Sequence, residues 1–335
     1  MVKRATRKDV SVLAGISPAV VSNVINGTGY VSPKTRTAVE NAIKTLNYHP
    51  NHVARSLRTK HTNQFIVIVN EIRNEFFAEI AYSMEQCAHS NGFTTLISNA
   101  RNDKAFVNHL ISRQADGVFV YSQKMDTKLI NLFAKSGINT VVCSNMQRED
   151  LDPSITKLYV DSQSGIFEAM NHLKGRGHTR IGYIHGIDVI SSGANDVRTI
   201  AYRQSLKESG IPYDADIVCL NAVLSDIFDV VKGLLSKANP PTTFLCGNDN
   251  FANAVMYALI KLGYRVPQDI SVVGYGDIAL TSIVYPTISS IRLPKKELGV
   301  VAAEILMRRL EDEECPDVTF PTKFIEREST MQIPN

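Results

Sequence analysis

Positively charged side chains gather at the start of this 335-residue sequence and could bind a polyanion. The first 62 residues hold ten Lys and Arg residues against two acids, Asp9 and Glu40, a net charge of +8. The remaining 273 residues carry 26 Lys and Arg against 31 acids, a net charge of −5. A small basic module on a larger acidic body predicts a polyanionic partner for the N-terminus, with nucleic acid favoured over a membrane surface.

Residues that could catalyse a reaction or bind a metal do not form a known motif. The sequence contains no Walker-type phosphate loop, G-x-G-x-x-G fingerprint, G-x-S-x-G elbow or H-E-x-x-H helix. His172 and His178 lie close in the sequence, but further metal ligands are missing nearby, and we expect His178 to be structural. We therefore expect neither an enzyme nor a cofactor. An odd number of widely spaced cysteines predicts buried free thiols: Cys87, Cys143, Cys219, Cys246 and Cys315.

Composition bounds the class of protein. With 335 residues, 44% of them hydrophobic, the chain can form two or three globular domains with a sizeable core. The N-terminus lacks the apolar core of a signal peptide, and no apolar run approaches the 18 or more residues of a membrane span. We expect a cytoplasmic protein that does not interact with a membrane.

Three helices are predicted in the basic module. Thr6 and Asp9 have the spacing of a capping box for a helix over residues 7–14, and Ser17-Pro18 and Ser32-Pro33 each place a capping serine before a first-turn proline. Two helices joined by a short turn with Gly15 predict a helix-turn-helix, although a small helical interaction domain has the same pattern. The first helix would bury the apolar stripe Val10, Leu13 and Ala14. The second would leave an outer face of Pro18, Ala19, Ser22, Asn23 and Asn26.

The module and the residues after it resemble the headpiece and hinge of the lactose/galactose repressor family of bacterial transcription regulators. The segments that carry the resemblance are Lys8-Asp9-Val10, Ala14-Gly15-Ile16-Ser17, Val20-Val21-Ser22-Asn23-Val24-Ile25-Asn26, Val31-Ser32, Lys34-Thr35-Arg36, Leu46-Asn47-Tyr48, Pro50-Asn51 and Val53-Ala54-Arg55-Ser56-Leu57. The resemblance implies that Pro18, Ala19 and Asn23 read bases in the major groove and that Ser22 and Asn26 contact phosphates. An Asn can pair with an adenine edge and an Ala methyl can touch a thymine methyl.

Residues 51–57 can form two helical turns, which are marginal in water without support and could fold only on binding. By the same resemblance, Leu57 is the wedge that enters the minor groove and bends the duplex. Val53 and Ala54 would contact the partner chain's hinge, while Arg55 and Arg58 supply charge near phosphates. Because Pro18 and Ala19 donate no side-chain hydrogen bond, this hinge is expected to contribute much of the operator selection.

From Gln64 onward, short apolar runs alternate with helix-length amphipathic segments. Strand-like runs begin near residues 65, 94, 117, 140, 181, 217, 243 and 270, and the clearest helical segments are residues 75–90, 164–176, 198–209 and 250–262. This alternation predicts two α/β lobes with parallel, doubly wound sheets, whose ligand lies at the carboxyl ends of the strands.

This region resembles the family's effector-binding core, which is similar to periplasmic sugar-binding proteins. Landmarks are Phe77-Ala78-Glu79-Ile80, Ala115-Asp116-Gly117, Gly175-Arg176-Gly177-His178, Asn248-Asp249, Val266-Pro267 and Asp269 to Tyr275. The resemblance implies three crossings between lobes, near Asp161, Ser290 and Lys323. The expected domains are a headpiece (1–49), a hinge and linker (50–62), a first lobe (63–161 plus 291–323) and a second lobe (162–290 plus 324–335).

Matched positions imply the effector contacts. Phe77 would stack on the ligand, Asp161 sits at a crossing, Arg198 would clamp ligand oxygens, and Asn248 and Asp249 form a polar pair, a chemistry that suits a polyhydroxylated ligand. Three alternatives stay open: Phe77 as core packing, Asp249 as a helix N-cap, and Arg198 in a surface ion pair.

One position departs from the family pattern. Relatives carry an acid directly after the Gly-Tyr of the last long strand, whereas Tyr275 is followed by Gly276, with Asp277 one place later. A carboxylate displaced by one residue generally points elsewhere, unless the glycine's freedom in φ redirects Asp277 into the site. We therefore count Asp277 as a sixth candidate contact.

The sequence thus predicts a homodimeric repressor that binds a palindromic, double-stranded DNA operator and responds to a small effector, such as a sugar or phosphosugar, in the cleft between the lobes. Two rivals remain. The core could answer mainly to a phosphorylated carrier protein, which the substitution at Gly276 keeps open. A binding protein of the periplasmic type is the other, but the basic headpiece argues against it.

Overall fold

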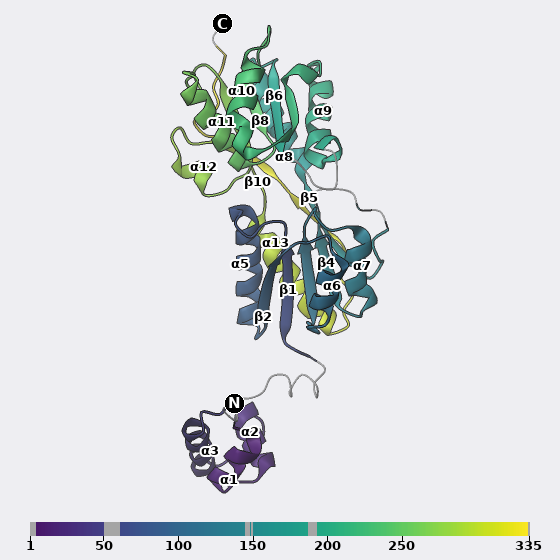
Figure 1. Ribbon diagram of the computed structural model, residues 1–335, viewed down its shortest axis with the longest axis vertical. Coiled ribbons are helices and arrows are strands. Elements are labelled where there is room, and N and C mark those ends of the chain that lie inside the picture. Colours follow the sequence, from purple (N-terminus) through teal and green to yellow (C-terminus); the bar gives the residue numbers. More distant parts are fainter. Residues whose placement is uncertain (1–4, 50–60, 145–147, 149, 187–192, 334–335) are drawn as a thin grey trace. The chain divides into compact units, whose positions relative to one another are not determined.

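A computed structural model describes residues 5–49, 61–144, 148, 150–186 and 193–333 (Figure 1). The chain divides into two compact units, Met1–Thr62 and Asn63–Asn335. Among the described residues, no single helix is long and apolar enough to cross a membrane, although one pair of helices bent by 109° passes the same test when taken together.

The first unit contains α1 (Arg7–Ala14), α2 (Pro18–Asn26) and α3 (Pro33–Thr45). Thr6 and Asp9 form the expected capping box, and Ser17 and Ser32 cap the two helices that begin with proline. Gly15 ends α1 at φ 67°, a left-handed conformation that glycine adopts without strain. The small core consists of Val10, Val21, Val24, Val39, Ala42 and Tyr48.

The expected apolar stripe of α1 is wrong at one position. Leu13 is 51% exposed, and Ser11 is buried on the same helix. The Ser11 hydroxyl donates to the carbonyl of Ile16, so it links α1 to the turn before α2. A satisfied polar group can therefore occupy the inner face of this short helix.

Within its described residues, the second unit contains two six-stranded sheets, in the orders β11-β5-β4-β3-β1-β2 and β12-β10-β9-β8-β6-β7. Every pairing is parallel except that of β10 with β12. The first sheet comprises β1 (Gln64–Val69), β2 (Thr94–Asn99), β3 (Gly117–Tyr121), β4 (Asn139–Cys143), β5 (Thr156–Asp161) and β11 (Val318–Pro321). The second comprises β6 (Ile181–Gly186), β7 (Val218–Ala222), β8 (Thr243–Cys246), β9 (Ser271–Gly276), β10 (Ser289–Arg292) and β12 (Lys323–Ile325).

Helices cover both faces of each sheet, which explains the continuous apolar runs of the sequence. On β1, Phe65 and Val67 pack in the cluster shared with α5 and α13, while Ile66 and Ile68 pack in the opposite cluster with α6 and α7. The helices are α5 (Glu75–Ser90), α6 (Lys104–Ile111), α7 (Thr127–Lys135), α8 (Ser162–Gly175), α9 (Val197–Ser209), α10 (Ile227–Leu235), α11 (Asp249–Lys261), α12 (Leu280–Ile283) and α13 (Lys295–Leu310).

Neither lobe is continuous in sequence. The first sheet takes strands from residues 64–161 and 318–321, and the second from residues 181–292 and 323–325. The crossing segments are tied together: the Thr322 hydroxyl donates to the Asp161 carbonyl over 2.6 Å and accepts from the Gly165 amide over 2.9 Å. A Cβ on Gly165 would lie 2.4 Å from that hydroxyl, so only glycine fits.

The cysteines and His178 have the environment of structural residues. All five cysteines are free thiols; Cys143, Cys246 and Cys315 are buried, while Cys87 and Cys219 are partly exposed, contrary to the expectation that all would be buried. His178 is buried between the Thr242 hydroxyl and the Met331 carbonyl. No group of three or more potential metal ligands occurs in the described part of the chain.

Candidate effector cavity and DNA-binding face

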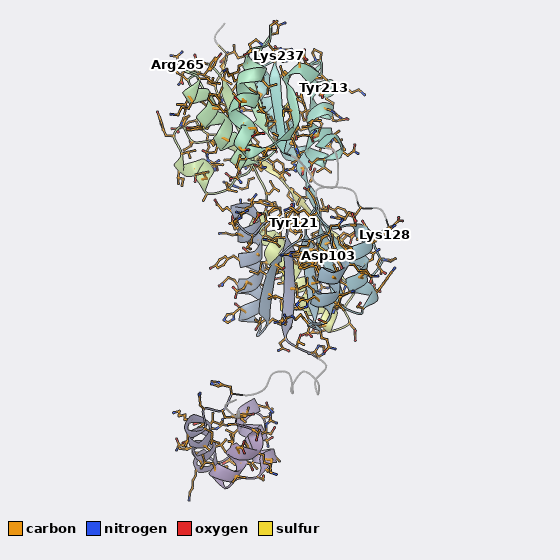
Figure 2. The ribbon with its side chains drawn as sticks, viewed as in Figure 1. Asp103, Tyr121, Lys128, Tyr213, Lys237 and Arg265 are labelled. Carbon is orange, nitrogen blue, oxygen red and sulfur yellow. The ribbon has the colours of Figure 1, made fainter. Side chains whose placement is uncertain are left out.

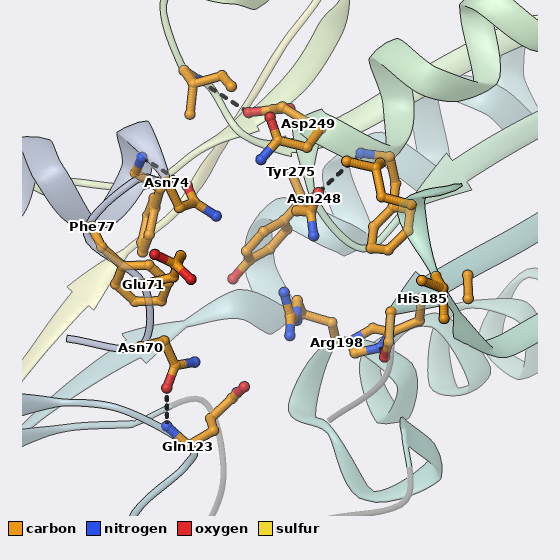
Figure 3. Close-up of a pocket in the computed structure, with 18 of the residues that line it drawn as sticks. Asn70, Glu71, Asn74, Phe77, Gln123, His185, Arg198, Asn248, Asp249 and Tyr275 are labelled. Atoms are coloured by element: carbon orange, nitrogen blue, oxygen red, sulfur yellow. Dashed lines mark hydrogen bonds between the residues drawn. The ribbon is translucent and has the colours of Figure 1, made fainter. Parts of the chain in front are cut away.

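A cavity of about 500 Å³ lies between the two sheets of the second unit (Figure 3). Most of its walls follow the carboxyl ends of strands or the first turns of helices, and Figure 2 shows Tyr121 at the end of the first sheet that faces the second lobe. The first lobe contributes Asn70, Glu71, Asn74, Phe76, Phe77, Tyr121, Gln123 and Lys124. The second contributes His185, Gly186, Arg198, Ala222, Val223, Leu224, Asn248, Asp249, Asn250, Phe251, Tyr275 and Ile278.

Aromatic rings form one wall. Phe77 lies edge-on to Phe76, with ring centroids 5.1 Å apart, and to Tyr121, at 5.4 Å. Tyr121 is buried and Phe77 is partly exposed to the cavity. Phe77 therefore packs against the core and also lines the cavity. Its two predicted roles, core packing and ligand stacking, do not exclude each other.

Arg198 is held by a buried carboxylate. Its Nε and Nη2 each donate to Asp196 over 2.7 Å, and its Nη1 donates to the Gly247 carbonyl over 2.7 Å. The side chain of Arg198 is 12% exposed and that of Asp196 is 0% exposed. Burial raises the pKa of Asp196, but the charge and hydrogen bonds of Arg198 outweigh it and hold this pKa well below its ordinary value. The pair is thus a buried ion pair and not a surface one.

Asn248 and Asp249 have different roles. Asn248, not Asp249, is the N-cap of α11, and its side chain accepts from the Phe251 amide over 3.0 Å. Asp249 is 2% exposed and accepts from the Ser290 hydroxyl over 2.5 Å and the Ile278 amide over 3.0 Å. Burial raises its pKa to about 6, against the lowering effect of these two hydrogen bonds.

Two expected effector contacts are absent from the residues that line this cavity. Asp161 caps α8, with its carboxylate accepting from the Gln163 and Ser164 amides. The Asp277 side chain is 5% exposed and bonded to Arg292 and Arg327, each over 2.6 Å. Their assignment as effector contacts has no support from this geometry, because neither side chain lines the cavity and each carboxylate is bonded elsewhere.

Several residues that line the cavity were not predicted as effector contacts from the sequence. Asn70, Gln123 and His185 each lie at or just after the carboxyl end of a strand that the apolar pattern had predicted. The rule that ligands gather at these ends would have found them. Lys124 donates to the Asn70 carbonyl over 3.0 Å, a contact that no local sequence pattern indicates.

On the first unit, the outer face of α2 is accessible. Pro18, Ala19 and Asn26 are exposed, while Ser22 and Asn23 are half-buried. The Ser22 hydroxyl accepts from Arg7 Nη1 over 2.9 Å and from Asn26 Nδ2 over 3.4 Å, so α1 supplies a cation beside this face. The hinge residues singled out from the sequence, Val53, Ala54, Arg55, Leu57 and Arg58, lie outside the described residues.

The buried ion pair leads to a prediction about stability. Arg198→Met leaves the Asp196 carboxylate buried without its main partner, so the free energy of unfolding should fall by about 3–5 kcal/mol. Adding Asp196→Asn removes the stranded charge and keeps a good cap for α9, so the double variant should recover a large part of the loss. Urea unfolding measures both values.

The exposed pair of Arg265 with Asp269 provides the control for that measurement. Arg265→Met should change the free energy of unfolding far less than Arg198→Met does, because exposed ion pairs contribute little. A double variant at Asp196 and Arg198 that is no more stable than Arg198→Met would contradict the role assigned to the stranded charge.

The raised pKa of Asp249 predicts that the free energy of unfolding depends on pH. Its pKa of about 6 in the folded protein exceeds the ordinary 3.8, so its stabilising contribution is present below pH 4 and is lost as the pH rises through 6. The neutral Asp249→Asn does not titrate. From pH 4 to pH 7, its free energy of unfolding should therefore rise relative to wild type by up to about 3 kcal/mol, as measured by urea unfolding at each pH. A difference that is constant across this range contradicts the prediction.

Comparisons with known proteins find similar proteins for both units of the chain. Residues 6–51 match the family described as bacterial regulatory proteins, lacI family, and residues 170–330 match a periplasmic binding protein-like domain. The chain is 31% identical over 318 residues to the HTH-type transcriptional repressor PurR of Photobacterium profundum, covering 92% of each chain.

Two solved structures are also similar. One is the lac repressor dimer bound to operator and the anti-inducer ONPF, with a TM-score of 0.86 and 25% identity over 98% of this chain and 100% of that one. The other is a complex of the transcriptional regulator CelR with cellobiose, with a TM-score of 0.71 and 27% identity over 97% of this chain and 100% of that one. The chain belongs to the lacI family of bacterial regulatory proteins and is a DNA-binding transcriptional regulator with an effector-binding core.

Proposed function

We propose that this regulator is a dimeric repressor that binds a palindromic operator and whose operator affinity is changed by a small hydroxylated effector. One observation carries the proposal: a basic unit with an accessible α2 face is joined to a core whose cavity combines aromatic, amide and buried arginine groups. DNA binding by the first unit and ligand binding by the second can then be coupled through the intervening residues.

On the DNA, α2 lies in the major groove, with Pro18, Ala19 and Asn23 facing bases and Ser22 and Asn26 facing phosphates. The accessible face of α2 and the Arg7 guanidinium beside Ser22 support this arrangement. The segment after Pro50 supplies Leu57 as the minor-groove wedge, with Val53 and Ala54 against the partner's hinge and Arg55 and Arg58 near phosphates.

In the core, the effector contacts Phe77, Arg198, Asn248 and Asp249. The aromatic ring covers the apolar face of a sugar, while the amide and guanidinium groups bond its hydroxyls. The solved complex of CelR with cellobiose supports a sugar-like ligand in this class of cavity. Contacts that cross between the lobes include Gln123 to Asp196 at 3.4 Å and the Ala279 amide to Glu75 at 2.5 Å. An effector that favours one arrangement of the lobes acts through such contacts.

The proposal also includes a two-fold homodimer and a cytoplasmic location. A single headpiece covers half of a palindromic site, so a two-fold dimer matches the operator. Large apolar side chains exposed on α5 and α11 support a second copy as the partner, with Tyr82 62%, Tyr257 60% and Ile260 54% exposed. The similar lac repressor structure is a dimer. Binding to bacterial DNA supports a cytoplasmic location as part of this proposal.

A second mode of control has one specific observation in its favour. The family resemblance implied an acid directly after Tyr275, where this chain has Gly276, and the neighbouring Asp277 is bonded to two arginines and does not line the cavity. A core with fewer ligand-binding carboxylates could respond mainly to a phosphorylated carrier protein. This remains the alternative to a small effector.

Operator binding can be tested on DNA fragments selected by the purified protein. Asn23→Ala should weaken specific binding by about 1–3 kcal/mol, because a bidentate contact to a base is lost. Fluorescence anisotropy at several salt concentrations measures the affinity, which should fall steeply with salt as counterions are released. The matched control is Asn41→Ala on the exposed side of α3, which should bind as wild type. Affinity independent of salt would refute this mode of binding.

Effector binding can be tested by thermal unfolding with a panel of sugars, nucleosides and phosphosugars. A ligand that binds only the folded state at a hundred times its Kd stabilises by about 2.7 kcal/mol and raises the midpoint. Phe77→Ala should abolish the shift, whereas Tyr285→Ala, which removes an 87% exposed aromatic side chain away from the cavity lining, should retain it. The absence of a shift with every compound would favour the protein partner.

A further inference from the structure

Arg7 is a half-buried cation at the start of α1 that reaches across to α2. Its Nη1 donates to the Ser22 hydroxyl over 2.9 Å, so the guanidinium is held against one side of α2. Arg7 is not among the residues assigned to DNA in the proposed docking. A positive charge fixed beside a face that lies on DNA would contact the DNA backbone or its bases, and its position on α2 distinguishes the two.

Two stripes of side chains run along the accessible face of α2, because residues four apart lie on the same side of a helix. In the proposed docking, Ala19 and Asn23 form the stripe that faces bases. Ser22 and Asn26 form the stripe that faces phosphates. Arg7 is bonded to the second stripe through Ser22. Its guanidinium therefore lies on the phosphate side of this helix.

The Ser22 hydroxyl is turned into a donor by its neighbours. Its oxygen accepts from Arg7 Nη1 over 2.9 Å and from Asn26 Nδ2 over 3.4 Å, which uses both of its lone pairs. The hydroxyl hydrogen is then the part of Ser22 that can bond a ligand. The guanidinium and the amide nitrogen beside it are donors as well. A phosphate has the matching chemistry, because its oxygens only accept and charge-assisted bonds to arginine are strong.

The charges around Arg7 favour an anion at this place. Asp9 is the acid in the first turn of α1, and its carboxylate accepts from the Thr6 amide and hydroxyl, each over 2.7 Å. This carboxylate is thus turned back to the start of α1, whereas Arg7 extends to α2. The first 62 residues carry a net charge of +8, which adds to the attraction of a polyanion.

We propose that Arg7 is a DNA-contact residue that clamps one operator phosphate together with Ser22. The proposal rests on the proposed function, because it requires α2 to lie in the major groove with Ser22 facing the backbone. The contact is independent of sequence, since every nucleotide carries the same phosphate. It adds affinity and fixes the register of α2 on the duplex. Pro18 and Ala19 donate no side-chain hydrogen bond, so this clamp holds the helix in place while other contacts select the site.

The first test compares an operator selected by the purified protein with an unrelated duplex of equal length. Arg7→Met removes the charge and keeps a long side chain, so it should weaken binding to both duplexes by a similar factor, roughly tenfold. The slope of log affinity against log salt should become shallower by about 0.9, the value of one lost phosphate contact. Arg7→Lys keeps the charge and should retain the slope. Fluorescence anisotropy measures each affinity.

Lys44→Met is the matched control, because it removes the same charge from the exposed last turn of α3. It should leave the salt slope and both affinities close to those of wild type, and thermal unfolding checks that each variant is folded. If Arg7→Met has the same salt slope as Lys44→Met, Arg7 only ties α1 to α2, and the proposal is overturned. A loss confined to the selected operator would make Arg7 a base-reading residue, which overturns the phosphate clamp as well.

The second test locates the phosphate on the selected operator. Neutral methylphosphonate is placed at one backbone position at a time, which removes single negative charges from the DNA. At one position in each half-site, wild type should lose affinity, whereas Arg7→Met should lose much less, because it no longer makes the contact. Ser22→Ala should also be less sensitive there. Equal sensitivity of wild type and Arg7→Met at every position contradicts the clamp.

The outcomes separate this proposal from the one on which it rests. If Asn23→Ala and Ser22→Ala both bind the selected operator as wild type does, the docking of α2 in the major groove is refuted, and the clamp with it. If these two variants weaken binding and folded Arg7→Met does not, only the role of Arg7 is refuted.

Discussion

Parallel strands impose the constraint on which this core depends. Because all strands of the first sheet and five strands of the second run in the same direction within their sheet, each sheet brings its carboxyl ends to one edge. Both edges border one cavity, so residues far apart in the sequence line the same space. In the helices that follow these strand ends, side chains accept hydrogen bonds from first-turn backbone amides. Asn74 and Asn248 cap α5 and α11 in this way at the cavity wall.

Buried charge is concentrated on the second-lobe side of that cavity. Asp196 holds Arg198, Asp249 is bonded by Ser290 and the Ile278 amide, and Gly274 lies so close that a Cβ would be 2.1 Å from Asp249 Oδ1. The two carboxylates differ because Asp196 faces a guanidinium, whereas Asp249 accepts only neutral hydrogen bonds. The first keeps its charge, and the second gains a proton more readily.

The two lobes are also coupled through their connections. Lys295, at the start of α13, donates to the carbonyls of Gly276 and Asp277 in the second lobe and lies 3.7 Å from Glu79 on α5 in the first. Thr322 fastens two of the crossing strands to each other. Motion of one lobe against the other must therefore rearrange a small set of buried polar contacts, which suits a regulator with discrete states.

The sequence by itself determined the headpiece helices, because capping residues and prolines act on neighbours within a few positions. It also predicted the alternating α/β pattern, because strands buried on both faces need continuous apolar runs. Phe77, Arg198, Asn248 and Asp249 were identified by matched position, and they line one cavity. Only the tertiary structure could separate Asp277 from that set, because the arginines that hold it come from residues 292 and 327. The bonds of Asp161 to the Gln163 and Ser164 amides are local by contrast. As with Asp277, the burial of His185 beside Asp196 and Arg198 arises from separate segments packed together, and no local pattern encodes such a contact.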